Sequence, residues 1–131
     1  MSAPAAIRKS DGIVYFMANL AVDTVKVGYT TNLKKRLDVL QTGNHNRLEI
    51  CCFVRASYAV EQLIHQALAP FLIRNEWFEH NASVDGLIRK IEEFEIEKGL
   101  QTGNFSPTIS PEDLISIRQR WMDAPLWKQC G

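Results

Sequence analysis

Long apolar runs are missing from this chain of 131 residues. No stretch reaches the roughly 18 residues that a membrane-spanning helix requires, so we expect no membrane association. The opening stretch, MSAPAAIRKSDG, contains no apolar segment long enough for a secretory signal peptide. These absences lead us to expect a cytoplasmic protein.

Cysteine is scarce, with three residues at Cys51, Cys52 and Cys130. No pair has the CxxC spacing that is typical of zinc sites. Cys51 and Cys52 are adjacent in an apolar run, so in a strand they would face opposite sides. We interpret the cysteines as small buried hydrophobic residues or inert thiols, which argues against a metal centre or disulfide built from them.

Net charge is also absent, since 15 Lys and Arg balance 15 Asp and Glu. The balance hides an asymmetry. Residues 1–60 hold 8 basic and 4 acidic side chains, a charge of +4, and residues 61–131 hold 7 and 11, a charge of −4. A modestly basic first half is compatible with a polyanionic partner.

Internal repeats and low-complexity segments are lacking as well, and 46% of the residues are hydrophobic. This length and composition predict one domain with its own core. We expect an N-terminal tail over 1–11, the main domain over 12–99, and a linker with a C-terminal helical extension over 100–131. We find no zinc finger and no clear helix-turn-helix pattern.

Two segments alternate in the manner of strands, IVYFMANLA and TVKVGYT, and the short connection around Asp23 predicts a hairpin. One face of the pair would be apolar and buried, consisting of Val14, Phe16, Ala18, Leu20, Val25, Val27 and Tyr29. Because side chains alternate strictly, the other face would hold Tyr15, Lys26 and Gly28.

The next segments predict a helix, a strand and a second helix. The first helix would be capped by Thr31 or Asn32, end at Gly43 and bury the stripe Leu33, Leu37 and Leu40. RLEICCFVRA resembles a third strand. Helical spacing of apolar residues then predicts a second helix from Ser57 to about Ile73, followed by NEWFEHN as a short irregular or extended piece.

The remaining chain is expected to be helical. Ser83 would cap a third helix with an acidic, solvent-facing side at EEFEIEKG, and Ser110-Pro111 would begin a last helix. The sequence therefore predicts an α+β fold, with a small, mostly antiparallel three-stranded sheet flanked by helices.

Four side chains from different segments suit phosphodiester chemistry. Water attack on phosphorus requires a base, a cation for the developing charge and often a metal ion at the leaving oxygen. Tyr15, Lys26, Arg36 and Glu61 supply these groups, and a guanidinium binds phosphate through two parallel hydrogen bonds. Lys34 and Lys35, beside Arg36, are either phosphate contacts or solvated surface.

The motifs resemble those of the GIY-YIG nuclease superfamily, in particular its compact phage and microbial branch. Ile13-Val14-Tyr15 and Lys26-Val27-Gly28 stand where the two family tripeptides would be. The spacing on to Arg36 is similar to the arginine-bearing helix of the family. Glu61 resembles the metal-binding glutamate, and Asn75-Glu76-Trp77-Phe78 matches the EWF signature of the branch. The resemblance covers about residues 12–80.

The resemblance implies hydrolysis of DNA by a metal-dependent endonuclease. Tyr15 would be the general base, Arg36 would stabilise the transition state, and Glu61 would hold one divalent ion, Mg²⁺ or Mn²⁺. Lys26 replaces the tyrosine of the archetype, and its ammonium group would lower the pKa of Tyr15 or bind phosphate directly. His65, four residues after Glu61, is either part of the site or a helix-packing histidine.

Other functions remain open at this point. The same scaffold would also serve a nucleic-acid-binding module without turnover, or a protein-interaction domain that uses its acidic helix and terminal tryptophans. Glu76 is a rival metal ligand. Trp121, Leu126 and Trp127 would form a patch that covers the domain, with a dimer contact or a stacking platform for nucleic acid as the alternatives. Homo-oligomerisation and a partner protein both remain open.

Overall fold

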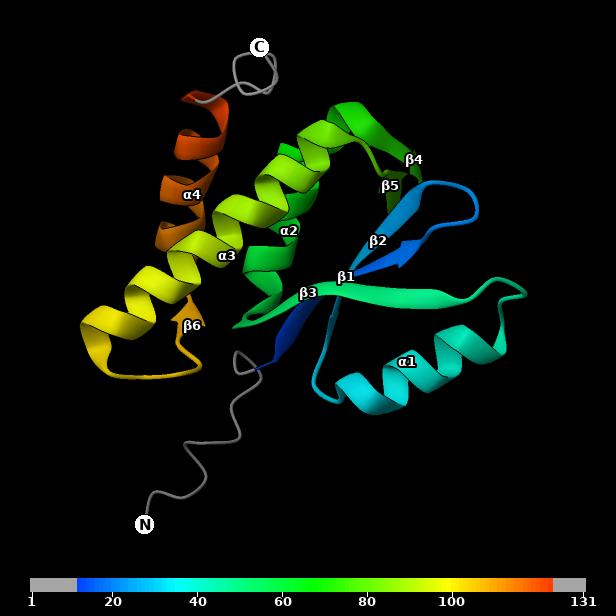
Figure 1. The fold of residues 1–131 in the computed structure, drawn as a ribbon, viewed down its shortest axis with the longest axis horizontal. Helices are drawn as coiled ribbons and strands as arrows, with labels where there is room; N and C mark the ends of the chain where they lie inside the picture. Colours follow the sequence, from blue (N-terminus) through cyan, green and yellow to red (C-terminus); the bar gives the residue numbers. More distant parts are fainter. Residues whose placement is uncertain (1–11, 124–131) are drawn as a thin grey trace.

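The fold is built on a six-stranded sheet with the strand order β4-β5-β2-β1-β3-β6 (Figure 1). The structure, a computed structural model, describes residues 12–123. Its elements are β1 (Ile13–Asn19), β2 (Thr24–Thr30), α1 (Leu33–Thr42), β3 (Leu48–Ala56), α2 (Tyr58–Ala67), the 3₁₀ turn η3 (Ala69–Phe71), β4 (Leu72–Arg74), β5 (Trp77–Glu79), α3 (Ala82–Thr102), β6 (Thr108–Ile109) and α4 (Pro111–Asp123). The mixed, mostly antiparallel architecture agrees with the sequence, but the predicted number of three strands is wrong.

The central hairpin follows the predicted alternation. β1 pairs antiparallel with both β2 and β3, and Asp23 takes a positive φ of 52° in the turn between β1 and β2. Val14 and Phe16 are fully buried in the core. Leu20 was predicted to lie on the buried apolar face, but it belongs to the turn and is 56% exposed.

The three additional strands are very short. β4 and β5 form a hairpin that extends the sheet beyond β2, where a helix end and an irregular piece were expected. α2 ends at Ala67, since Pro70 lies in the following 3₁₀ turn and cannot continue an α-helix. On the other side, β6 pairs in parallel with the end of β3.

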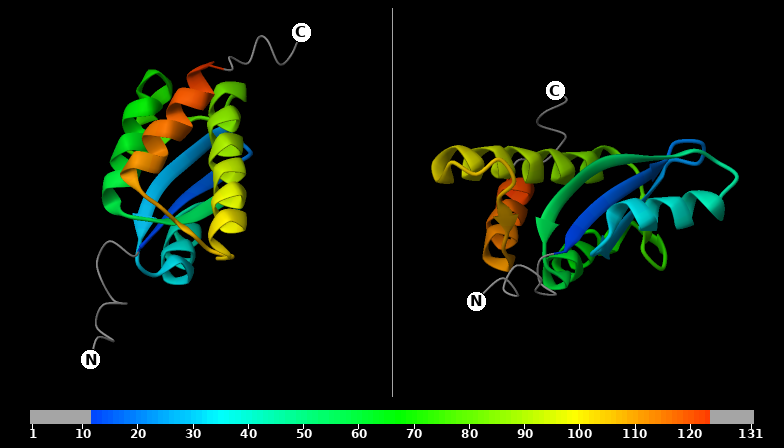
Figure 2. Two further views of the ribbon diagram at one scale, coloured as in Figure 1. Left: turned by 90° about the vertical axis from the view of Figure 1, so that its left-hand side faces the viewer. Right: turned by 90° about the horizontal axis from the view of Figure 1, so that it is seen from below.

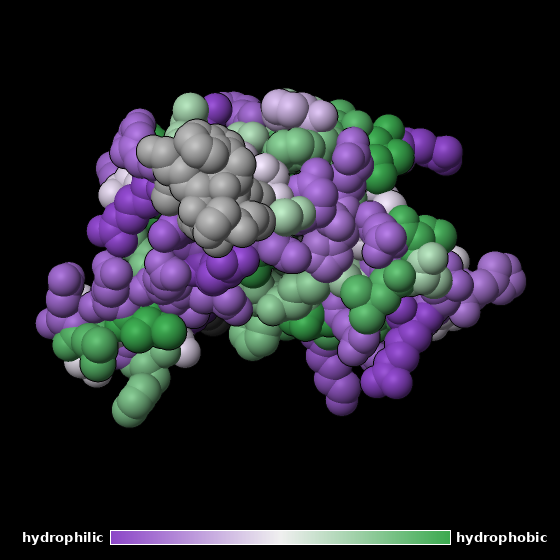
Figure 3. All heavy atoms as spheres, turned by 45° about the horizontal axis from the view of Figure 1, so that its top comes forward, coloured by the Kyte–Doolittle hydropathy of each residue, from purple (hydrophilic) through white to green (hydrophobic). Residues whose placement is uncertain are grey.

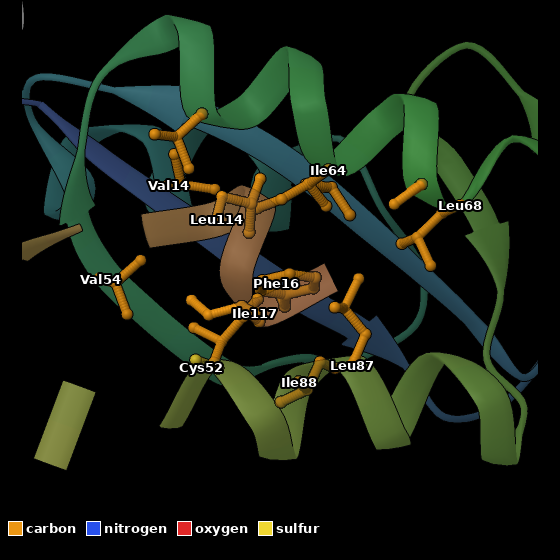
Figure 4. Close-up of a cluster of buried hydrophobic side chains, with 14 of the residues drawn as sticks. Val14, Phe16, Cys52, Val54, Ile64, Leu68, Leu87, Ile88, Leu114 and Ile117 are labelled. Carbon is orange, nitrogen blue, oxygen red and sulfur yellow. The ribbon is translucent and has the colours of Figure 1, made fainter. Parts of the chain in front are cut away.

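The helices lie on both faces of the sheet (Figure 2). α1 lies alone on one face, and α4 lies between α2 and α3 on the other. The core fills the space between these three helices and the sheet, as the close-up in Figure 4 shows. α4 contributes Leu114 and Ile117 to it, so the C-terminal part of the chain packs into the same core.

The helix ends bear out most of the expected caps. Asn32 caps α1 by accepting a hydrogen bond from the Lys35 backbone, and Ser110 exchanges hydrogen bonds with Asp113 at the start of α4. α3 is capped by Asn81, so the expectation of Ser83 is wrong. The leucine stripe of α1 is only half-buried, and α1 has no fully buried residue.

The two cysteines of β3 differ in burial, at a point where the pairing with β1 shifts register. Cys52 is buried in the core, whereas Cys51 is exposed. Burial is the main factor that raises the pKa of each thiol, and the nearby Glu92 carboxylate adds to it. Both thiols therefore carry little thiolate at neutral pH.

The C-terminal helix closes the fold. The Trp121 indole packs against the core and donates a hydrogen bond to the Ser83 carbonyl oxygen, 2.9 Å away. Leu126, Trp127 and Cys130 lie outside the described residues. Of the helices within residues 12–123, none combines the length and the apolar character required to cross a membrane.

Candidate nuclease site at the edge of β2

Tyr15 lies against the backbone of β2. It pairs with Gly28 in the β1–β2 register, on the sheet face opposite the core residues Val14 and Phe16. A β-carbon added at Gly28 would lie 2.4 Å from the Tyr15 hydroxyl, so the phenol occupies the space above the glycine. Lys26 lies on the same face by alternation, as predicted.

α2 is docked along β2 at two points. His65 Nε2 donates to the Val27 carbonyl oxygen at 2.9 Å, and the Tyr58 ring meets the Tyr29 ring edge to face at 5.9 Å. Glu61 lies about one turn from each contact on the same face of α2. Glu61 therefore lies on the α2 face that packs against β2.

Glu61 is one of the few buried charged groups among the described residues, with 2% of its surface exposed. The hydrogen bond that its carboxylate accepts comes from Gln62 Nε2 at 2.9 Å. Burial raises the pKa of Glu61 above its ordinary value, and Glu76 adds to this, while Gln62, His65 and Lys26 act in the opposite direction. The site thus contains a carboxylate whose charge is poorly compensated.

The charges around Tyr15 come from three other elements. Burial raises the pKa of Tyr15 to about 12, Arg36 opposes this, and Glu76 and Glu61 contribute to it. All three charged groups are therefore within electrostatic reach of the hydroxyl. Of the two alternatives for Lys26, a lowered pKa of Tyr15 is not observed, because this pKa is raised, and direct binding of phosphate stays a prediction.

Lys26 has a different partner. Its ammonium group lies 2.6 Å from Glu76 Oε1 and 5.9 Å from the centre of the Trp77 ring. Glu76 belongs to the β4–β5 turn, where Asn75 takes a positive φ of 55° that asparagine tolerates well. Glu76 was predicted from the sequence as an alternative metal ligand. The hairpin that brings it to Lys26 was not predicted.

His65 has a clear packing role. Besides its hydrogen bond to Val27, its ring meets the Phe78 ring at 5.2 Å in an edge-to-face arrangement. These two contacts hold α2 against β2 and β5. They position Glu61, which stands one turn earlier in the helix.

The basic turn of α1 lies beside the site. Lys34, Lys35 and Arg36 are exposed, and Arg36 forms no ion pair with another residue in 12–123, Asp38 included. A depression of about 440 Å³ opens at the start of this helix, lined by Thr30, Thr31, Asn32, Lys35, Arg36 and Val39. Lys34 does not line it.

The donor set fits a single hydrated divalent ion better than a protein-enclosed metal. Within residues 12–123, no three His, Cys, Asp or Glu side chains gather as a metal centre. Mg²⁺ is commonly held by one or two carboxylates while it keeps several waters. A buried carboxylate with one hydrogen-bond donor and a second carboxylate within electrostatic reach meets that requirement at Glu61.

Comparison with known proteins identifies the domain. The family model of the T5orf172 domain matches residues 12–95. This domain family is associated with nuclease-related proteins. No match was found among curated proteins or among solved structures.

Proposed function

The chain belongs to the T5orf172 domain family, and from this premise we propose that it is a metal-dependent endonuclease that hydrolyses DNA phosphodiester bonds by a GIY-YIG-type mechanism. One observation carries the proposal: Arg36 and Glu61, from two different helices, both shift the pKa of the buried Tyr15. A guanidinium and a carboxylate thus lie within electrostatic reach of the phenol, beside an exposed basic turn.

Arg36 binds the scissile phosphate in this mechanism. It is exposed and has no ion-pair partner among the described residues, so its guanidinium is accessible to phosphate oxygens. As water attacks phosphorus, negative charge grows on the oxygens that are not transferred, and Arg36 stabilises it. Lys34 and Lys35 contact flanking phosphates and hold the DNA in register.

Tyr15 accepts the proton of the attacking water. The new phosphorus–oxygen bond forms as that proton moves to the phenolate oxygen, and the bond to the leaving oxygen breaks as this oxygen takes up a proton from solvent water. With a pKa of about 12, Tyr15 is protonated at neutral pH in the protein alone. Arg36 favours the phenolate form of Tyr15. The negative charge of Glu61 disfavours the phenolate, so neutralising that charge removes this effect.

Glu61 would hold the divalent ion, with water as most of the remaining ligands. When bound, Mg²⁺ or Mn²⁺ supplies a Lewis acid that stabilises the leaving oxygen. Glu61 suits this role because burial and the charge of Glu76 both disfavour its ionised form. A bound cation would compensate that negative charge. His65 keeps the carboxylate in place through its contacts with Val27 and Phe78.

A second candidate is a DNA-binding module without turnover. The specific observation in its favour is the high pKa of Tyr15 together with the pairing of Lys26 to Glu76, which leaves the phenol without a lysine to activate it. Such a module would show salt-dependent DNA binding that weakens on Lys35→Ala or Arg36→Ala, with no cleavage.

Cleavage of supercoiled plasmid with Mg²⁺ or Mn²⁺ tests the proposal. Wild-type protein should nick or linearise the plasmid, and Tyr15→Phe and Glu61→Gln should each slow cleavage by about 10²-fold or more. Glu79→Gln is the matched control, because it removes an exposed carboxylate on β5. A folded wild-type protein that binds DNA but never cuts it would establish the binding module instead.

A further inference from the structure

The outer edge of β3 is open along most of its length. β6 borders β3 on this side but pairs only with Arg55 and Ala56. No described strand pairs with the outer edge of residues 48–54. Figure 1 shows β3 continuing far beyond β6. Such an edge offers backbone donors and acceptors to another extended chain.

The hydrogen-bond pattern identifies outward-facing groups. Ala56 donates its N–H to the Gly12 carbonyl oxygen on the β1 side, at 3.0 Å. In an antiparallel ladder the direction alternates from residue to residue, so Arg55 and Phe53 direct their backbone groups away from β1. Arg55 is paired with β6, which leaves Phe53 as the first outward-facing position without a strand beside it.

A groove lies alongside this edge. It has a volume of about 450 Å³ and is lined by residues 50–53 of β3, by Glu92 and Glu95 of α3 and by Phe105. Glu95 and Phe105 also line a second, more apolar hollow of about 360 Å³, to which Ile96 and Leu100 contribute.

Large apolar side chains are strongly exposed at the second hollow. Leu100 is 81% exposed and Phe105 is fully exposed. Figure 3 shows green, hydrophobic side chains gathered with purple ones at the left end of the molecule, where α3 ends. Exposed apolar groups beside an open strand edge are typical of an interaction surface.

We propose that this groove binds an extended segment of a partner protein that carries lysine or arginine, and that the segment adds to the outer edge of β3 as a further strand. Backbone hydrogen bonds to β3 hold the segment, which is the mode known as β-augmentation. Its cationic side chains meet Glu92 and Glu95, and an apolar side chain enters the hollow at Leu100 and Phe105. The surface lies on elements other than α1 and α2 and does not depend on the proposed nuclease activity.

Charge favours this partner over the alternatives. Glu92 and Glu95 border the groove and form no ion pair within residues 12–123, so DNA would be repelled. A second copy of the chain, paired edge to edge through β3, would bring two such acidic helices together. An extended cationic segment can form backbone hydrogen bonds with the strand edge and pair its positive charges with the two carboxylates.

The probe is a fluorescent peptide of about seven residues with alternating lysine and valine, roughly the length of the open edge. Fluorescence anisotropy with the full chain should show binding, and amide NMR shifts should concentrate on residues 50–53 and on α3. N-methylation of alternate peptide groups of the probe should weaken binding at least about tenfold, because it removes backbone donors. Glu92→Lys with Glu95→Lys should weaken it to a similar degree.

Glu93→Lys with Glu97→Lys is the matched control, since it makes the same charge change on α3 at two exposed residues that line neither hollow. It should leave binding within about twofold of wild type, because solvent screens exposed charges that do not line the groove. Absence of binding, or equal binding of the N-methylated probe, would overturn the proposal. So would self-association or DNA binding that shifts the same β3 amides.

Discussion

The Tyr15 hydroxyl fills the space that a side chain at Gly28 would need, and a β-carbon there would lie only 2.4 Å from it. Any larger residue at position 28 must displace the ring, which is 1% exposed and enclosed by the fold. The glycine and the tyrosine are therefore one structural unit. The position of the proposed base depends on an absent side chain on the neighbouring strand.

Gly28→Ala should reduce both stability and cleavage. Overpacking of this kind costs about 1–3 kcal/mol in the free energy of unfolding, and the displaced phenol loses its position relative to Glu61. Chemical denaturation and plasmid cleavage measure the two effects. Gly43→Ala is the control, because a β-carbon there would have its nearest neighbour at 3.9 Å. Unchanged cleavage in a folded Gly28→Ala variant would contradict the proposed role of Tyr15.

Tyr15 should make the fold sensitive to alkali. Its pKa is raised from 10.0 to about 12 in the folded protein, so its stabilising contribution is complete below about pH 10 and is lost as the pH rises through about 12. Urea denaturation between these pH values should show a smaller loss of stability for Tyr15→Phe than for wild type. Parallel losses in the two proteins would mean that Tyr15 is not buried as a neutral phenol.

Glu76→Gln should shift the pH dependence of cleavage to lower pH. The Glu76 charge raises the pKa of Tyr15 and that of Glu61, so its removal lowers both. The substitution also releases Lys26 from its 2.6 Å ion pair. Between neutral and moderately alkaline pH, the cleavage rate of this variant should begin to rise at a lower pH than the rate of wild type. A shift to higher pH would show that Glu76 acts mainly by holding Lys26 in place.

His65→Ala should destabilise the protein by about 1–3 kcal/mol, since it leaves the Val27 carbonyl without its partner and opens a gap beside Phe78. Cleavage should fall with it, because Glu61 loses its support. Thermal unfolding and cleavage at a temperature well below the transition separate the two effects. A large loss of rate with no loss of stability would give His65 a direct part in the chemistry.

Lys35→Ala and Arg36→Ala should each weaken DNA binding and reduce the salt dependence of the affinity by about one phosphate contact. Lys34→Ala should have a smaller effect, because Lys34 does not line the depression at the start of α1. Anisotropy titrations of a DNA duplex over a range of salt concentrations give, for each variant, the slope of log affinity against log salt concentration. Equal slopes for all three variants and wild type would exclude this turn from the DNA interface.

Local patterns in the sequence were sufficient for the centre of the fold. Strict alternation in β1 and β2 determines that Tyr15, Lys26 and Gly28 share a face, and side-chain chemistry at Asn32 and Ser110 determines two helix starts. These features depend on neighbours in the chain. They were predicted without knowledge of the packing.

The short strands and the charge pairings depend on distant contacts. β4, β5 and β6 have only three, three and two residues, too few for a periodic pattern to emerge. Leu72 also continues the apolar spacing of α2, so the pattern predicted a longer helix in place of the β4–β5 hairpin. The pairing of Lys26 with Glu76 joins residues 50 positions apart, and it changed the expected effect of Lys26 on Tyr15.

The central claim is that Glu61 binds a divalent cation beside Tyr15. Paramagnetic broadening of NMR signals by Mn²⁺ tests it most directly, because the effect falls steeply with distance from the ion. We predict that broadening centres on Glu61 and reaches Gly28 and the Tyr15 ring, and that it disappears in Glu61→Gln but persists in Glu79→Gln. Broadening that is centred elsewhere, or that survives in Glu61→Gln, would contradict the proposed site.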